Sequence, residues 1–167
     1  MNNLEKTRMM ARYRQWADQI TFDSVAALPP GEAAKERPTL FKSMIGTLNH
    51  HLVIDSIWQA HLEGRDHGFK ARNVVLHDKL DDLWRAQQAM NRWYIDWSEA
   101  ETEESLDKVM PFTFIGGETS TMTRGDMHLH VVTHAHYHRG WVAEMFFQVP
   151  ARPPATDLPV FLKTKVR

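Results

Sequence analysis

The sequence predicts an all-α fold, a four-helix bundle with a short loop or hairpin before the last long helix. Four segments repeat apolar residues at helical spacing, and proline, glycine or polar stretches separate them. The chain has 167 residues and is 43% hydrophobic, which suffices for one buried core. It shows no internal repeat or linker, so we expect residues 1–167 to form a single domain.

The first helix is expected from about residue 3 to 28. Asn2 and Glu5 have the spacing of a capping box, in which each side chain bonds the backbone N–H of the other residue. The stretch "LPPGEAAKERP" follows, and its two adjacent prolines and its glycine cannot continue a helix. This stretch therefore predicts a connecting loop.

The second helix is expected at about residues 39–63, with Thr39 as its N-cap after Pro38 and Gly64 as its C-terminal stop. A third amphipathic helix is expected from about residue 76 to 100. Residues 101–121 begin acidic and then combine β-prone residues with a proline and two glycines, which predicts a loop or short hairpin.

The last long helix is expected to begin after Thr123, which forms a second capping-box candidate with Asp126, and to run to about Phe147. Beyond Pro150 the chain is rich in proline and then has a few apolar residues. These residues predict a short closing turn against the bundle.

Composition excludes several classes of function. Twenty basic residues oppose twenty-one acidic ones, which does not favour a nucleic-acid partner. No run approaches the roughly 18 apolar residues of a membrane span, and the charged amino terminus is unlike a signal peptide, so we expect a cytoplasmic protein. Without cysteine, any metal must be held by His, Asp or Glu, and any thiol chemistry needs a thiol from outside.

Histidines concentrate in "HLHVVTHAHYHRGWV", residues 128–142, which holds five of the ten in the chain. On a helix, His130, His134 and His138 lie within an arc of about 80°, whereas His128 and His136 are assigned to surface or loop contacts. Two imidazoles four residues apart are close enough to share one ion, but a spacing of eight residues, about 12 Å, is too long. The pair is therefore 130/134 or 134/138.

A third ligand would have to come from another helix, since catalytic metal sites typically have three protein ligands and an open position. The segment "GTLNHHLVIDSIW" offers His50 and His51, which are adjacent and so point about 100° apart. Periodicity does not decide between them. Solvated or hydrogen-bonded histidines without a metal are the alternative, and the polar neighbours Tyr137 and Arg139 are candidate substrate contacts.

These motifs resemble the DinB-like (YfiT-like) family of bacterial four-helix-bundle metalloenzymes. The matching features are "YRQWAD" in the first helix, "GTLNHHLVIDSIW" in the second, "THAHYHRG" in the last, and the later "PPATDLPVFL". Together they cover most of the chain in the family's order. The resemblance implies three histidine ligands, one from the second helix and two from the last, at His50, His134 and His138.

The resemblance also implies a function. Three neutral imidazoles with an open position suit Zn²⁺, Ni²⁺ or Fe²⁺. Some relatives look like transferases or isomerases that use a low-molecular-weight thiol, and many form homodimers. We therefore expect a metal-dependent enzyme acting on a small molecule, such as an S-transferase using glutathione, with no catalytic side chain assigned.

Two alternatives remain open at this stage. One is a non-catalytic metal or small-ligand binding protein of a stress response. The other is a structural or interaction bundle in which the histidines are incidental. Metal content and the effect of His134→Ala would separate them from the enzyme.

Overall fold

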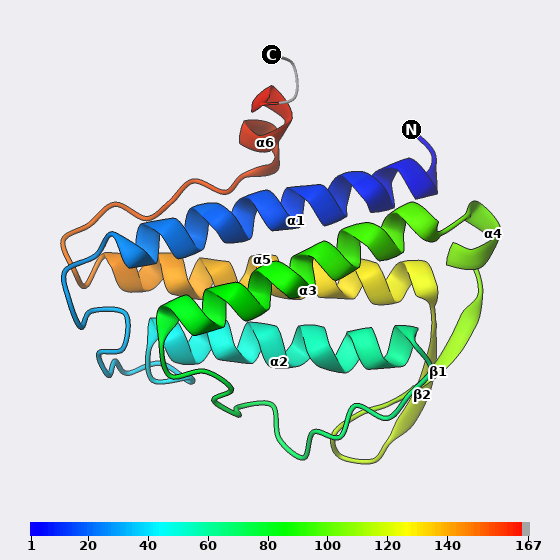
Figure 1. The fold of residues 1–167 in the computed structure, drawn as a ribbon, viewed down its shortest axis with the longest axis horizontal. Coiled ribbons are helices and arrows are strands. Elements are labelled where there is room, and N and C mark those ends of the chain that lie inside the picture. Colours follow the sequence, from blue (N-terminus) through cyan, green and yellow to red (C-terminus); the bar gives the residue numbers. More distant parts are fainter. Residues whose placement is uncertain (165–167) are drawn as a thin grey trace.

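The computed structural model describes residues 1–164. Four long helices dominate it, and a two-stranded sheet and two short helices complete it (Figure 1). In chain order the elements are α1 (Asn3–Ala26), α2 (Met44–Leu62), α3 (Leu80–Ala100), α4 (Glu103–Leu106), β1 (Val109–Thr113), β2 (Thr119–Thr123), α5 (Arg124–Phe146) and α6 (Leu158–Thr164).

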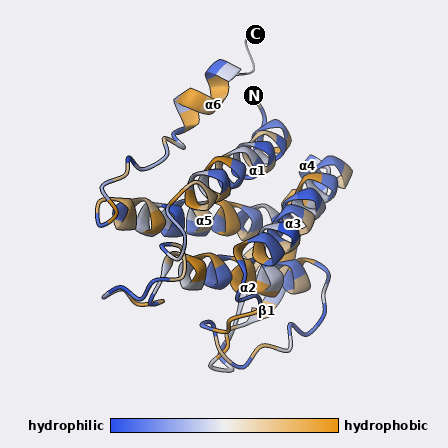
Figure 2. Ribbon diagram, turned by 60° about the vertical axis from the view of Figure 1, so that its left-hand side comes forward, coloured by the Kyte–Doolittle hydropathy of each residue, from blue (hydrophilic) through white to orange (hydrophobic). Residues whose placement is uncertain are grey.

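The four long helices form a bundle, as the sequence predicts. Helix α2 contacts α5 and α3, and α1 contacts the same two helices from the other side. The order around the bundle is therefore α1, α3, α2, α5, and Figure 1 shows α1 and α2 on opposite sides. Figure 2 shows hydrophobic and hydrophilic residues mixed along the helices; α1, α3 and α5 each keep exposed residues, whereas α2 is buried along almost its whole length.

Two helices begin where the sequence predicts. Asn2 caps α1 in a capping box with Glu5, in which the side chain of each residue accepts from the backbone N–H of the other. Thr123 caps α5, because its hydroxyl accepts from the backbone N–H of Asp126. Both helices end slightly before the predicted residue, at Ala26 and Phe146.

Helix α2 begins at Met44, so the prediction of a start at residue 39 with Thr39 as N-cap is wrong. The cap is Ser43, whose side chain accepts from the backbone N–H of Gly46. Before it the backbone turns back on itself: Lys42 has a φ of 68° and donates to the Thr39 carbonyl. This turn places the ring of Phe41 against α2.

Helix α3 begins at Leu80, four residues after the predicted start. The backbone N–H groups of Leu76 and His77 donate to Oδ1 of Asn49, and Nδ2 of Asn49 donates to the His77 carbonyl. These bonds to a buried side chain of α2 replace the first turn of the predicted helix. They also hold the end of the loop 63–79 along α2.

Residues 109–123 form the predicted hairpin, with β1 antiparallel to β2 and Val109 opposite Thr123. It lies beside the carboxyl end of α2 and the start of α5 (Figure 1). The single turn α4 was not predicted. The expected closing turn is α6, whose Phe161 packs on the rings of Tyr13 and Trp16.

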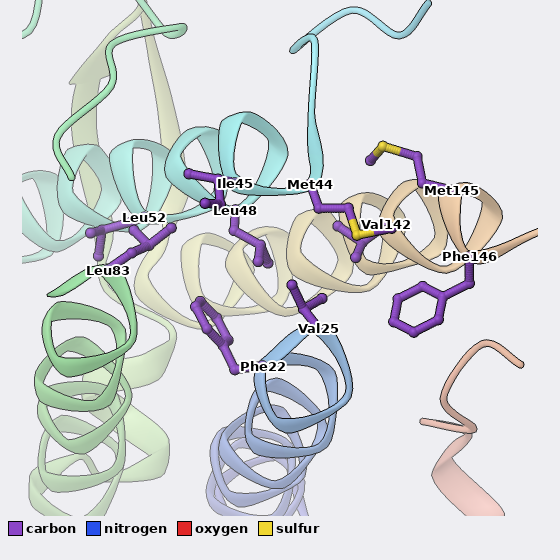
Figure 3. Packing of buried hydrophobic residues seen from close by; sticks show 10 residues of the cluster. All are labelled: Phe22, Val25, Met44, Ile45, Leu48, Leu52, Leu83, Val142, Met145 and Phe146. Carbon is purple, nitrogen blue, oxygen red and sulfur yellow. The ribbon is translucent and has the colours of Figure 1, made fainter. Parts of the chain in front are cut away.

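The core lies between the four long helices. One cluster joins side chains from α1, α2, α3 and α5, and Figure 3 shows how they converge. Its buried members are Phe22, Val25, Met44, Ile45, Leu48, Leu52, Leu83, Val142, Met145 and Phe146. Within residues 1–164, none of the helices combines the length and apolar character needed to span a bilayer.

Candidate metal centre

Three histidines from two helices meet at one point between α2 and α5. His50 lies on α2, and His134 and His138 lie one turn apart on α5. Their ring centroids are 4.3 to 5.1 Å apart. One nitrogen from each ring lies within 4.8 Å of those of the other two. The structure thus brings together the three histidines that the resemblance implies.

The orientation of His50 is fixed by the loop 63–79 and by Phe41. Its Nδ1 is 2.7 Å from the backbone carbonyl of Arg72, and a carbonyl can only accept, so Nδ1 carries the proton. This leaves the lone pair on Nε2, which is 3.2 Å from Nε2 of His134. Phe41 stacks on the imidazole, with centroids 4.1 Å apart.

This arrangement fits a bound cation. A tetrahedral ion with Zn–N bonds of about 2.0–2.1 Å holds its ligand nitrogens about 3.3–3.4 Å apart. The Nε2 atoms of His50 and His134 are 3.2 Å apart, close to that spacing. In the part of the chain that the structure describes, Nδ1 of His138 is buried without a hydrogen-bond partner. Neutral nitrogen donors of this kind suit divalent transition metals.

The environment keeps these imidazoles neutral. Burial, followed by the neighbouring His138, lowers the pKa of His134 to about 2. Burial and the nearby His50 lower the pKa of His138 to about 4, and burial also lowers the pKa of His50. Only the neutral ring offers a lone pair to a metal, so the site is in its binding form at neutral pH.

His51 and Arg139 face away from this site into a buried ionic network. Arg139 is 3% exposed and donates from Nη1 to Asp18 at 2.9 Å. Arg14 pairs with Asp55, and its Nη2 lies 3.3 Å from Nε2 of His51.

The prediction that Arg139 contacts a substrate does not fit this placement. Of the two adjacent histidines, His50 is the one beside His134.

The three histidines open into a cavity of about 690 Å³. Its walls come from α2, α5, the loop 63–79 and the hairpin, and most of them are apolar. Tyr137 lies at its mouth and is 60% exposed, which keeps it available as a substrate contact. His130 also lines the cavity, with its ring 5.6 Å from that of His134 but outside the group of three.

Several lining residues were not predicted from sequence. Trp58 and Trp141 lie on helical apolar stripes, which favour packing in the core, yet both line the cavity. Phe41, Phe112 and His61 reach it through the turn before α2, through β1 and through the end of α2. Only tertiary packing brings these elements together, so no local sequence signal marks them.

His128 corrects another expectation. The sequence assigned it to the surface, but its side chain is only 2% exposed and its ring stacks on Trp97 with centroids 5.4 Å apart. It faces α3 rather than the cavity. Burial, followed by the nearby Arg14 charge, lowers the pKa of His128 to about 3.

Comparisons with known proteins agree with this architecture. The model of the DinB family matches residues 1–166. The protein DinB of Bacillus subtilis (strain 168) is 24% identical over 157 residues, which cover 90% of each chain. The crystal structure of a DinB-like protein from Bacillus cereus ATCC 10987 superposes with a TM-score of 0.62 at 14% identity, over 86% of this chain and 91% of that one. At this identity, the structural match speaks for the fold alone.

Proposed function

This chain belongs to the DinB family, and from that premise we propose that it binds one divalent metal ion through His50, His134 and His138 and uses it in catalysis on a small molecule. The observation that carries the proposal is the meeting of three neutral imidazoles from two helices at the inner end of an apolar cavity. Structural metal sites are usually closed by four protein ligands, whereas catalytic sites keep a position open. Three ligands facing a cavity support the catalytic alternative.

The side chains around the three histidines support binding in definite ways. The Arg72 carbonyl fixes the tautomer of His50, as the second ligand shell of metal sites commonly does. Phe41 stacks on His50 and meets His138 edge to face, so it limits the rotation of both rings. When bound, Zn²⁺, Ni²⁺ or Fe²⁺ would supply Lewis acidity that lowers the pKa of a water or thiol ligand.

We propose in particular a thiol-dependent S-transferase. The chain contains no cysteine, so a sulfur nucleophile has to come from a low-molecular-weight thiol such as glutathione. The cavity has room for a thiol together with the apolar part of an electrophile. Tyr137 is the polar side chain at its mouth that is placed to contact either molecule.

Elemental analysis of the untagged protein tests the metal site. We expect about one transition-metal ion per chain in the wild type and at least a tenfold reduction in His134→Ala, because two imidazoles hold an ion far less tightly than three. His136→Ala is the matched control, since His136 lies exposed on the same helix. A wild-type protein without metal would contradict the proposal.

Activity is tested separately on metal-loaded protein with glutathione and a panel of electrophiles. Conjugation that is lost in His134→Ala and kept in His136→Ala supports the S-transferase. Full metal content without conjugation of any electrophile would instead support the non-catalytic binding protein.

A further inference from the structure

The charge of the residues that line the cavity beside the three histidines indicates which ligands it can bind. Nineteen residues from the described part of the chain line it, and none of them is Asp or Glu. Arg72, which is exposed, is the lining residue that carries a permanent charge. Ligand pockets typically combine apolar walls with a few polar groups that fix orientation. Here the fixed charge is positive.

Arg72 belongs to the end of the cavity where the histidines lie. Its backbone carbonyl is 2.7 Å from Nδ1 of His50. Within residues 1–164 no carboxylate lies within ion-pair distance, 4.0 Å, of the Arg72 guanidinium, whereas the exposed Arg92 has Asp96 at 3.6 Å. Arg72 is therefore free to pair with a ligand.

The mouth of the cavity is apolar although it meets solvent. Leu40 and Phe114 line the cavity and are 72% and 49% exposed, and the aromatic ring of the 60% exposed Tyr137 lies there with them. Exposed apolar side chains that gather around a hollow are typical of a binding site rather than of a free surface. Deeper in, Trp58 and Phe112 pack against each other with ring centroids 5.0 Å apart and form an aromatic wall.

We propose that the cavity takes an organic monoanion whose carboxylate lies at the Arg72 end and whose flat apolar body lies against Trp58, Phe112 and Phe114. The carboxylate is placed by the guanidinium and, because this rests on the proposed metal function, by the cation that the three histidines hold. The apolar body removes the exposed rim from water. A cationic ligand is disfavoured by both positive groups.

Calorimetric titration of zinc-loaded protein with four probes tests this. The probes are 4-phenylbutyrate, 4-phenylbutylamine, 4-phenylbutan-1-ol and butyrate, which separate the charge from the ring. We expect 4-phenylbutyrate to bind at least about tenfold more tightly than the amine and than butyrate. Equal or tighter binding of the amine overturns the proposal.

Paired variants locate the two contacts. Arg72→Gln should weaken the binding of 4-phenylbutyrate about threefold to tenfold and leave the affinity for 4-phenylbutan-1-ol unchanged, since the substitution removes only an attraction for the carboxylate. Arg92→Gln, on the exposed face of α3, should change the affinity for neither probe. Phe114→Ala should weaken the binding of 4-phenylbutyrate and of the alcohol alike. Phe147 is 68% exposed at the end of α5, and Phe147→Ala should weaken neither.

Metal content measured on the same samples separates this inference from the proposed function. Zinc bound without preference for the carboxylate, or the same affinities in Arg72→Gln and Arg92→Gln, refutes the inference alone. A chain that binds none of Zn²⁺, Ni²⁺ and Fe²⁺ refutes the proposed function. The same titrations on that metal-free chain then decide whether Arg72 alone selects the anion.

Discussion

At the scale of single residues, neighbours in sequence serve two different parts of the molecule. On α2, His50 faces the cavity and His51 faces the buried ionic network; on α5, His138 and Arg139 divide in the same way. A rotation of about 100° between successive helical residues produces this division. The network with Asp18 on α1 thus fixes how α2 and α5 are rotated, and with them the directions of the candidate ligands.

Breaking the ionic network should destabilise the protein strongly. Arg139→Ala leaves Asp18 buried with one partner fewer, and removing one member of a buried pair typically costs about 3–5 kcal/mol of unfolding free energy. Urea unfolding measures the loss. Arg92→Ala, in an exposed pair with Asp96, should have little effect, and equal losses in the two variants would argue against the network.

His128 should make stability depend on pH. Its pKa is about 3 in the folded protein, whereas in the unfolded chain it is about 6.5. Between these values the unfolded state binds more protons, so the contribution of His128 to stability is complete above about pH 6.5 and falls as the pH drops. The loss at pH 5 relative to pH 7.5 should be about 2 kcal/mol.

Urea unfolding at several pH values checks this against His128→Gln, which cannot titrate. The wild type should lose more stability than the variant between pH 7.5 and 5. Identical pH profiles would show that His128 is not buried in its neutral form.

At the scale of elements, the start of α2 depends on a glycine. A Cβ on Gly46 would lie 2.0 Å from the carbonyl oxygen of Phe41, so Gly46→Ala must displace the turn that holds Phe41 over His50. We expect a loss of about 1–3 kcal/mol, as for other overpacking substitutions, and weaker metal binding. Urea unfolding and metal titration of the variant measure both effects.

Gly140 is the matched control for this change. It lies exposed within α5, and a Cβ there would meet nothing within 4 Å. Gly140→Ala should therefore stabilise the protein by about 0.5–1 kcal/mol, because alanine favours the helix. If both variants lost stability equally, contact with the Phe41 carbonyl would not be the cause.

The elements that sequence predicts well are those encoded locally. Helical periodicity and the caps Asn2 and Thr123 predicted α1 and α5 to within two residues. The predicted starts of α2 and α3 were five and four residues too early, because a turn over residues 37–43 precedes α2 and the backbone N–H groups of Leu76 and His77 donate to Asn49. Periodicity overestimates a helix wherever a side chain of another element offers the backbone a different partner.

The candidate site likewise has features that the sequence predicts locally and features that depend on the whole fold. Helical geometry alone placed His130, His134 and His138 on one face, because their spacing is local, and left the pairs 130/134 and 134/138 open. It could not choose between His50 and His51, since that depends on how α2 is rotated in the bundle. The aromatic walls of the cavity come from the hairpin and from the turn before α2, whose positions follow from the whole fold.

At the scale of the whole molecule, the candidate ligands span most of the fold. His50 and His134 are separated by 84 residues in sequence, and helix α3 and the hairpin lie between them along the chain. An unfolded chain does not hold them together. A metal ion at this site should therefore bind the folded state and connect α2 to α5, so that metal affinity becomes part of the folding free energy.

Metal addition should raise the thermal midpoint of unfolding, because the ion binds the folded state. A free ion concentration of about 100 times its dissociation constant adds about 2.7 kcal/mol, provided that the unfolded chain does not bind. For a chain of this length, that corresponds to a shift of about 5–10 °C. Calorimetry of metal-stripped protein with and without Zn²⁺ or Ni²⁺ measures it. His136→Ala should shift like the wild type and His134→Ala should not, whereas equal shifts in the two variants would place the stabilising ion elsewhere on the chain.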